Sequence, residues 1–76
     1  HTRDLSALFR RKSNPHIIKD ALKRIDDVVD VEIIDIYKGE PIKEDEISYT
    51  FSIQSLSKES LEECEKLIKG FGGITR

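Results

Sequence analysis

The 76-residue sequence predicts a small α+β domain with a ferredoxin-like βαββαβ order, in which two helices cover one face of a four-stranded antiparallel sheet. Three observations support this prediction. Residues 47–54 alternate apolar and polar side chains at every step, which is typical of a strand with one buried face. Residues 28–37 are rich in β-branched side chains. Two further segments, following residues 14 and 57, repeat apolar side chains at helical spacing.

The first and last strands of the sheet are expected near the two ends of the chain. Residues 5–10 form the first strand, which places Leu5, Ala7 and Phe9 on one side. Residues 74–76 are long enough for a short terminal edge strand. Because crossover connections are right-handed, both helices then lie on the same side of the sheet. The other side, called the open face below, is left to solvent or to a ligand.

Each helix has a predicted start and an apolar stripe. Ser13 or Asn14 can cap the first helix, and Pro15 suits its first turn. Ser57 can cap the second helix, and a glycine among residues 70–73 can end it in the left-handed conformation. The stripe of the first helix consists of Ile17, Ile18, Ala21, Leu22 and Ile25, and that of the second of Leu61, Cys64, Leu67, Ile68 and Phe71.

The two central strands divide their side chains between the faces of the sheet. In the first of them, Ile34 and Ile36 are expected in the core, and Asp35 and Tyr37 on the open face. The charged connection at residues 38–46 contains glycine and proline and cannot continue the strand. In the second, the inward residues are Ile47, Tyr49, Phe51 and Ile53, and the outward ones are Ser48, Thr50, Ser52 and Gln54.

Length and composition indicate one domain over residues 1–76, and the absence of a starting Met suggests a fragment of a longer chain. The 13 basic and 15 acidic side chains give a net charge of −2, which argues against a general polyanion binder. No segment resembles a membrane span or a secretory signal. The single cysteine, Cys64, fits a reducing compartment, so a cytoplasmic location is expected.

No catalytic residues and no metal ligands are predicted. The two histidines, His1 and His16, are distant in sequence from Cys64, so a Cys-His nucleophile pair has little support. The acidic clusters lack the spacing of a calcium loop and are read as solvated turns. The glycines of residues 70–73 end a helix instead of opening one, which argues against a phosphate-binding loop.

The open face is the candidate site. An aromatic side chain on an exposed sheet can stack on an unpaired base, and polar neighbours can bond to its edges. Asp35 beside Tyr37 is unusual on a strand, because Asp is disfavoured there. The structural alternative is that Asp35 pairs with a neighbouring side chain and Tyr37 packs at the sheet edge.

These same residues carry a resemblance to a known family. Residues 35–42 and 48–51 resemble the motif of the ferredoxin-fold anticodon-binding domain, which closes the β subunit of bacterial phenylalanyl-tRNA synthetase. The opening at residues 3–6 and the ending at residues 70–76 are also similar to that family, so the resemblance spans nearly the whole chain.

The resemblance implies that the open face binds the anticodon region of tRNA(Phe). Tyr37 would stack on a base, Asp35 and Ser48 would bond to base edges or ribose, and Arg3 and Lys38 would contact phosphates. The full set of implied RNA-binding residues is Arg3, Asp4, Ser6, Asp35, Tyr37, Lys38, Ser48 and Thr50. The domain itself would be non-catalytic and hold no cofactor. ATP and Mg²⁺ would act in other domains of the ligase, with the catalytic α subunit and the remaining β-subunit domains as partners.

A second hypothesis is a ferredoxin-like regulatory or assembly domain that binds a small ligand or a second copy of itself. It is supported by the apolar component of residues 28–37 and by Leu8, which can leave apolar patches on the open face.

Overall fold

Strand β1 (Thr2–Arg10) separates its side chains between the two faces of the sheet. Leu5, Ala7 and Phe9 are buried beneath the helices, as the alternation predicts, whereas Ser6 and Leu8 on the opposite face are half-buried. A computed structural model describes residues 1–39 and 44–75 of the chain. The part of the predicted turn at residues 40–43, and Arg76 of the predicted terminal strand, lie outside the described residues.

Helix α1 (Pro15–Lys23) begins where its cap predicts. The Asn14 side chain accepts a hydrogen bond from the backbone N–H of His16 at 2.9 Å, and proline occupies the first helical position, where no N–H is needed. Ile18 and Leu22 are buried against the sheet. The predicted stripe is narrower than expected, because Ile17 is 58% exposed.

A sharp turn at Asp27 leads into strand β2 (Val28–Tyr37), which pairs antiparallel with strand β3 (Glu46–Ser55). Asp27 has a φ of 70°, a left-handed conformation that Asp tolerates better than most residues. Its carbonyl accepts the backbone N–H of Leu56 at 2.9 Å, so the turn that starts β2 is bound to the segment that follows β3.

Helix α2 (Lys58–Gly70) is anchored at its start by three serines. The Ser57 hydroxyl accepts the N–H of Ser60 as the N-cap, and the hydroxyls of Ser55 and Ser60, both buried, hydrogen-bond to each other. The helix buries Leu61, Cys64 and Ile68. Its end turns at Gly72, whose φ of 89° confirms a glycine in the left-handed region.

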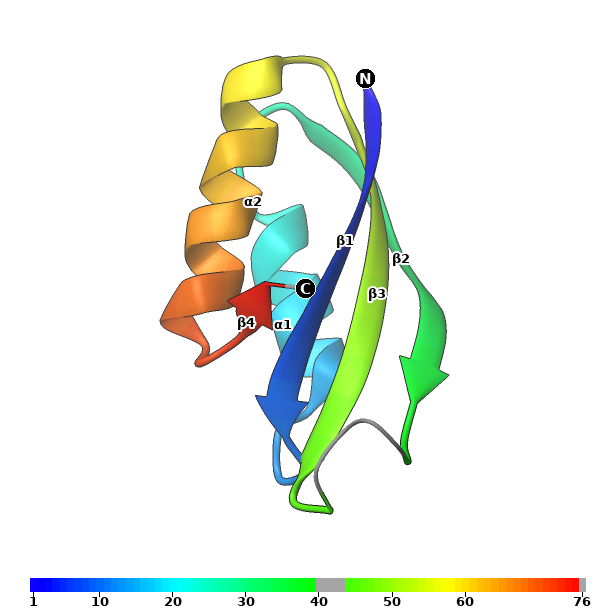
Figure 1. The fold of residues 1–76 in the computed structure, drawn as a ribbon. Helices are drawn as coiled ribbons and strands as arrows, with labels where there is room; N and C mark the ends of the chain where they lie inside the picture. The colour runs from blue at the N-terminus through cyan, green and yellow to red at the C-terminus, as the bar shows by residue number, and fades with distance from the viewer. Residues whose placement is uncertain (40–43, 76) are drawn as a thin grey trace.

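Strand β4 (Ile74–Thr75) is only two residues long and pairs with β1 at Ala7 and Leu8. The strand order is β2-β3-β1-β4, and the helices cover one face of the sheet (Figure 1). The predicted α+β class, with an antiparallel sheet and two helices, is confirmed. No helix in the described part of the chain has the length and apolar character needed to cross a membrane.

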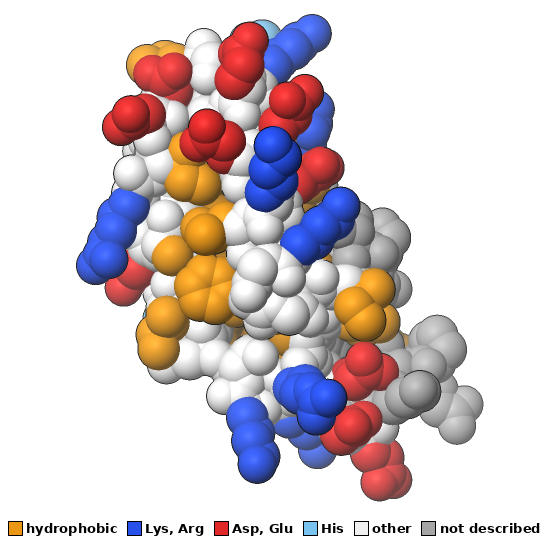
Figure 2. All heavy atoms as spheres, turned by 90° about the vertical axis from the view of Figure 1, so that its left-hand side faces the viewer, with side chains coloured by type: hydrophobic (Ala, Val, Ile, Leu, Met, Phe, Trp, Pro, Cys, Tyr) orange, Lys and Arg blue, Asp and Glu red, His pale blue; other side chains and the backbone are white. Residues whose placement is uncertain are grey.

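The core lies between the sheet and the two helices. Rings of Phe9, Tyr49 and Phe51 contact one another, with centroids 5.6–6.4 Å apart. On the outer side of the helical layer, apolar side chains lie across the middle and acidic side chains gather at the upper end (Figure 2). The buried apolar residues are Leu5, Ala7, Phe9, Ile18, Leu22, Val31, Ile47, Tyr49, Phe51, Ile53, Leu61, Cys64 and Ile68.

The prediction for Ile34 and Ile36 is wrong, because both side chains are about half exposed, at 49% and 52%. Strand β2 contains a register shift in which Ile33 pairs with Phe51 and Asp35 with Thr50, so Ile34 is an extra residue without a partner opposite. Ile36 pairs with Tyr49 and is on the helical side, but it lies one residue from the end of an edge strand. Ile33 packs against the core instead.

Gly73 has a steric role that gives a testable prediction. A Cβ at this position would lie 2.7 Å from the ring of Phe9 and 2.8 Å from the carbonyl of Ile68. We expect Gly73→Ala to lower the free energy of unfolding by about 1–3 kcal/mol, because backbone must shift to make room.

Gly70→Ala is the matched control, since its added Cβ meets nothing within 4 Å apart from its chain neighbours and the backbone of its own helix. At the end of a helix this change should leave stability unchanged or raise it by up to about 1 kcal/mol. Urea unfolding of both variants provides the measurement, and equal stabilities would contradict the role of the close contact.

Candidate functional site

The open face is ordered in rows that the strand registers define across β1, β3 and β2. The rows are counted here from Thr2, so the first two pass through Gln54 and Ser52 of β3. The third row joins Ser6, Thr50 and Asp35, and the fourth joins Leu8, Ser48 and Tyr37. Ile74 of β4 extends the fourth row, because it pairs with Leu8. Six of the predicted site residues are therefore brought together on one surface: Asp4, Ser6, Asp35, Tyr37, Ser48 and Thr50.

The polar groups in the middle of the open face bond to one another. The hydroxyls of Ser6 and Thr50 are 2.7 Å apart, directly beside Asp35 in the same row. Ser48 is only 2% exposed although it is on the open face. Its neighbours in the row, Leu8 and Tyr37, flank it on both sides. Ser48 therefore offers little of its surface to a ligand in this conformation.

Carboxylates dominate the charge of the open face. The first two rows contain Asp30 opposite Gln54, and Asp4 and Glu32 on either side of Ser52. Asp35 adds a fourth carboxylate one row further along. Among the described residues, the only cation that the registers place in these rows is Arg10, which is opposite Glu46 at the far end. Such a surface repels phosphate groups.

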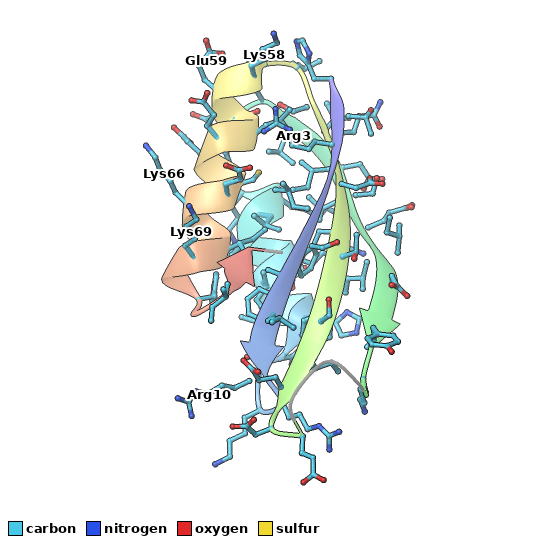
Figure 3. All side chains as sticks on the ribbon, viewed as in Figure 1. Arg3, Arg10, Lys58, Glu59, Lys66 and Lys69 are labelled. Atoms are coloured by element: carbon cyan, nitrogen blue, oxygen red, sulfur yellow. The ribbon has the colours of Figure 1, made fainter. Side chains whose placement is uncertain are left out.

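Neither predicted phosphate contact lies within this surface. Arg3 is on the helical side of β1, and its guanidinium forms an ion pair of 3.7 Å with Glu65 of α2. Figure 3 shows Arg3 between β1 and α2, on the side away from the open face. Lys38 follows the last residue of β2 and is exposed. The predicted site is thus divided between two sides of the sheet.

A hollow of about 440 Å³ lies where β4 stops covering β1. Its lining includes a positive side chain, that of Arg10, and two negative ones, those of Asp45 and Glu46. The sequence carries no signal for this hollow, because its lining comes from β1, the start of β3 and the segment that follows α2. Its lining is Leu8, Phe9, Arg10, Asp45, Glu46, Gly72 and Ile74.

Two carboxylates of the open face were also missed. Asp30 was included in the predicted strand but received no role, and it is on the open face of β2. Glu32 received no role, although it is level with Asp4 across the sheet. With Asp35 and Tyr37 on the open face, unbroken alternation puts Asp30 and Glu32 on the opposite face. The register shift near Ile33 brings all four to the same face, and the sequence does not reveal it.

The surroundings of Cys64 disfavour its reactive form. Cys64 is fully buried, and burial, together with the nearby charge of Glu63, raises the pKa of its thiol to about 11. The thiolate, which is the nucleophilic form, is therefore strongly disfavoured at neutral pH. No group of three or more His, Cys, Asp or Glu residues within these ranges has the arrangement of a metal site.

Comparison with known proteins gives an informative match. No family model matches the chain. A "Probable arogenate/prephenate dehydrogenase" from Methanocaldococcus jannaschii is 39% identical to it over 77 aligned positions, which cover 96% of this chain. The chain spans only 17% of the length of that relative. The similarity is therefore nearly complete for this chain and local for the dehydrogenase.

This relative corrects the functional hypothesis drawn from the sequence. The resemblance to the anticodon-binding domain of phenylalanyl-tRNA synthetase is wrong, and with it the proposed role in tRNA(Phe) binding and the synthetase subunits as partners. The physical reason is visible in the site itself. Short motif segments coincided with that family, but the fold places carboxylates where a phosphate-binding surface needs cations.

The burial of Cys64 gives a prediction about pH. The folded pKa of about 11 exceeds the ordinary value of 9.0, so the thiol form stabilises the fold fully below pH 9. That contribution is lost as pH rises from 9 towards 11, because the unfolded chain releases the proton first. Urea unfolding across this range should show a stability difference between the natural chain and Cys64→Ala that is constant below pH 9 and shrinks above it.

Tyr49 is present in both the natural chain and Cys64→Ala, so the effect of its titration cancels in the difference between their stabilities. Burial also raises the pKa of its phenol, whose hydroxyl donates to the carbonyl of Ser13 at 3.3 Å. A stability difference that stays constant up to pH 11 would contradict the assignment of a raised pKa to Cys64.

Proposed function

We propose that this chain is a non-catalytic domain of a longer protein related to the Methanocaldococcus dehydrogenase, in which it serves regulation or assembly. The supporting observation is the 39% identity across 96% of the chain, confined to 17% of the relative. A match that covers nearly all of one chain and a small part of the other is expected when the first corresponds to one domain of the second. On this proposal, arogenate or prephenate oxidation belongs to the other parts of that protein.

The proposed fold for this domain is ferredoxin-like, with residues 1–76 as one unit. The element order β-α-β-β-α-β and the strand order β2-β3-β1-β4 support it, as does the location of both helices on one face. The two-residue β4 is the weakest part of the pattern. Its pairing with Leu8 nevertheless brings the end of the chain beside its first strand.

A binding role fits the surface better than a catalytic one. Nicotinamide dinucleotides are commonly held where a glycine-rich turn connects a strand to a helix start in a parallel sheet. Here the strands pair antiparallel, and Gly72 and Gly73 follow the end of a helix. The domain is proposed to hold no cofactor of its own. Its exposed apolar side chains and the charged hollow near Arg10 provide surfaces for binding instead.

The Methanocaldococcus relative allows a direct test. We expect deletion of its aligned segment to leave dehydrogenase activity but to alter the oligomeric mass or the response to added ligands. A chimera that carries this 76-residue chain in place of the segment should recover the original behaviour, because the two share 39% of their residues. Activity assays and sedimentation velocity provide the measurements.

A folded deletion variant without activity would overturn the non-catalytic role, with circular dichroism reporting the folding. Unchanged mass and unchanged ligand response after deletion would overturn the regulatory and assembly roles.

A further inference from the structure

The outer edge of β2 is a part of the surface to which the proposed function assigns no specific partner. The strand order places β2 at one border of the sheet, so β3 pairs with one side of its backbone and no other strand in the described part of the chain pairs with the other side (Figure 1). Unpaired N–H and C=O groups along an edge are a template for another strand. Residues 28–37 contain no Pro, Gly, Lys or Arg, which are residues that commonly interrupt or protect such edges.

Exposed apolar side chains concentrate on this strand. In the described part of the chain, eight large apolar residues are exposed, and four of them belong to β2. Isolated exposed apolar side chains are ordinary, whereas several on one free edge indicate a contact surface. The four are Val29, Ile34, Ile36 and Tyr37, with exposed fractions of 54%, 49%, 52% and 42%.

The charges of β2 lie on one side of the strand. Asp30, Glu32 and Asp35 are all on the open face, opposite Gln54, Ser52 and Thr50. On the helical side, Ile33 and Ile36 pair with Phe51 and Tyr49. An added strand would therefore meet carboxylates on one face and apolar side chains on the other.

A second copy of the chain is a poor occupant of this edge. Two copies paired through β2 in antiparallel fashion would form one continuous sheet with their open faces on the same side. Asp30, Glu32 and Asp35 of both copies would then lie on two adjacent strands, and β2 contains no cation to offset them. Like charges on neighbouring strands are destabilising.

We propose that the β2 edge binds an extended segment of a partner polypeptide in which apolar residues alternate with Lys or Arg. The cations would lie beside Asp30, Glu32 and Asp35, and the apolar side chains beside Ile33 and Ile36. Backbone hydrogen bonds would add the segment to the sheet as a further strand. The proposal does not depend on the dehydrogenase relationship.

The register shifts interrupt the pairing of the added strand. They leave two regular stretches of β2, Asp30 to Ile33 and Asp35 to Tyr37, separated by the extra residue Ile34. A bulge bends the edge and prevents continuous pairing along its whole length. The partner segment therefore pairs with β2 in two short runs, beside Asp30 to Ile33 and beside Asp35 and Ile36, and the pairing is interrupted opposite Ile34.

The test uses the isotope-labelled 76-residue chain and an acetylated, amidated hexapeptide of sequence Lys-Val-Lys-Ile-Lys-Val. Titration to millimolar peptide should shift the amide resonances of β2. The peptide with Glu in place of each Lys should cause no such shifts, because it presents the wrong charge. Absence of shifts, equal effects of both peptides, or shifts centred on β1 or the helices would overturn the proposal.

Charge reversal in the protein provides a matched pair of variants. Asp35→Lys should weaken peptide binding by about three- to tenfold, because a cross-strand attraction becomes a repulsion. Asp4→Lys makes the same change in net charge on the same face, but on β1, two strands away from the edge. It should leave the affinity nearly unchanged. A larger effect of Asp4→Lys would place the peptide on the β1 edge and overturn the proposal.

Two further measurements separate strand addition from simple charge attraction and from self-association. Peptides N-methylated on all Lys or on all apolar residues each lose one set of backbone donors, so one of the two should fail to bind. Equal binding of both would overturn strand pairing. Sedimentation equilibrium of the chain alone should give a monomer, whereas a dimer abolished by Ile36→Lys would replace the partner segment with a second copy.

Discussion

The rest of the structure depends on the pairing of β3 along both of its sides. β1 and β2 flank it, so its backbone is satisfied within the sheet and its side chains can go only to one face or the other. Ile47, Tyr49, Phe51 and Ile53 all turn towards the helices and are almost fully buried. Two of the three contacting aromatic rings, those of Tyr49 and Phe51, belong to this strand, and the third, that of Phe9, belongs to the neighbouring strand β1. Both helices then pack on a surface whose register β3 has set.

The same two-residue period determines what remains outside. Each apolar residue that β3 directs inward places a polar neighbour on the open face, and the flanking strands contribute carboxylates to the same rows. A surface with this charge favours cationic partners and disfavours polyanions. Function in this small domain is therefore constrained by the sheet pattern itself, before any particular ligand is considered.

Local patterns predicted most of the fold. The cap at Asn14, the cap at Ser57 and the left-handed glycine were all visible in the sequence, because each depends on side chains within a few residues. The extra residues in β2 were not, since a bulge is decided by how two distant strands fit together.

The site was predicted less well than the fold, and Arg3 shows why. The alternation that buried Leu5 and Ala7 already implied that Arg3 points towards the helices, where it meets Glu65. The family resemblance assigned it instead to phosphate binding on the other face. A periodicity that spans a whole strand was a better guide than matches of three or four residues. The hollow beside Arg10 needed the tertiary path of the chain end and had no sequence signal.

The buried serines at the start of α2 have a consequence for how the domain is held together. The Ser55 hydroxyl lies 3.2 Å from the Asp27 carbonyl and accepts the N–H of Ser57 at 3.1 Å, while Ser60 closes the group. One neutral network thus fastens the α1–β2 turn, the end of β3 and the start of α2. The chain start joins the same end, because the N-terminal ammonium of His1 donates to the Ser55 carbonyl at 2.8 Å. Hydrogen bonds among three elements therefore hold this end of the domain together, whereas Ile36 and Tyr37 at the other end of β2 are exposed.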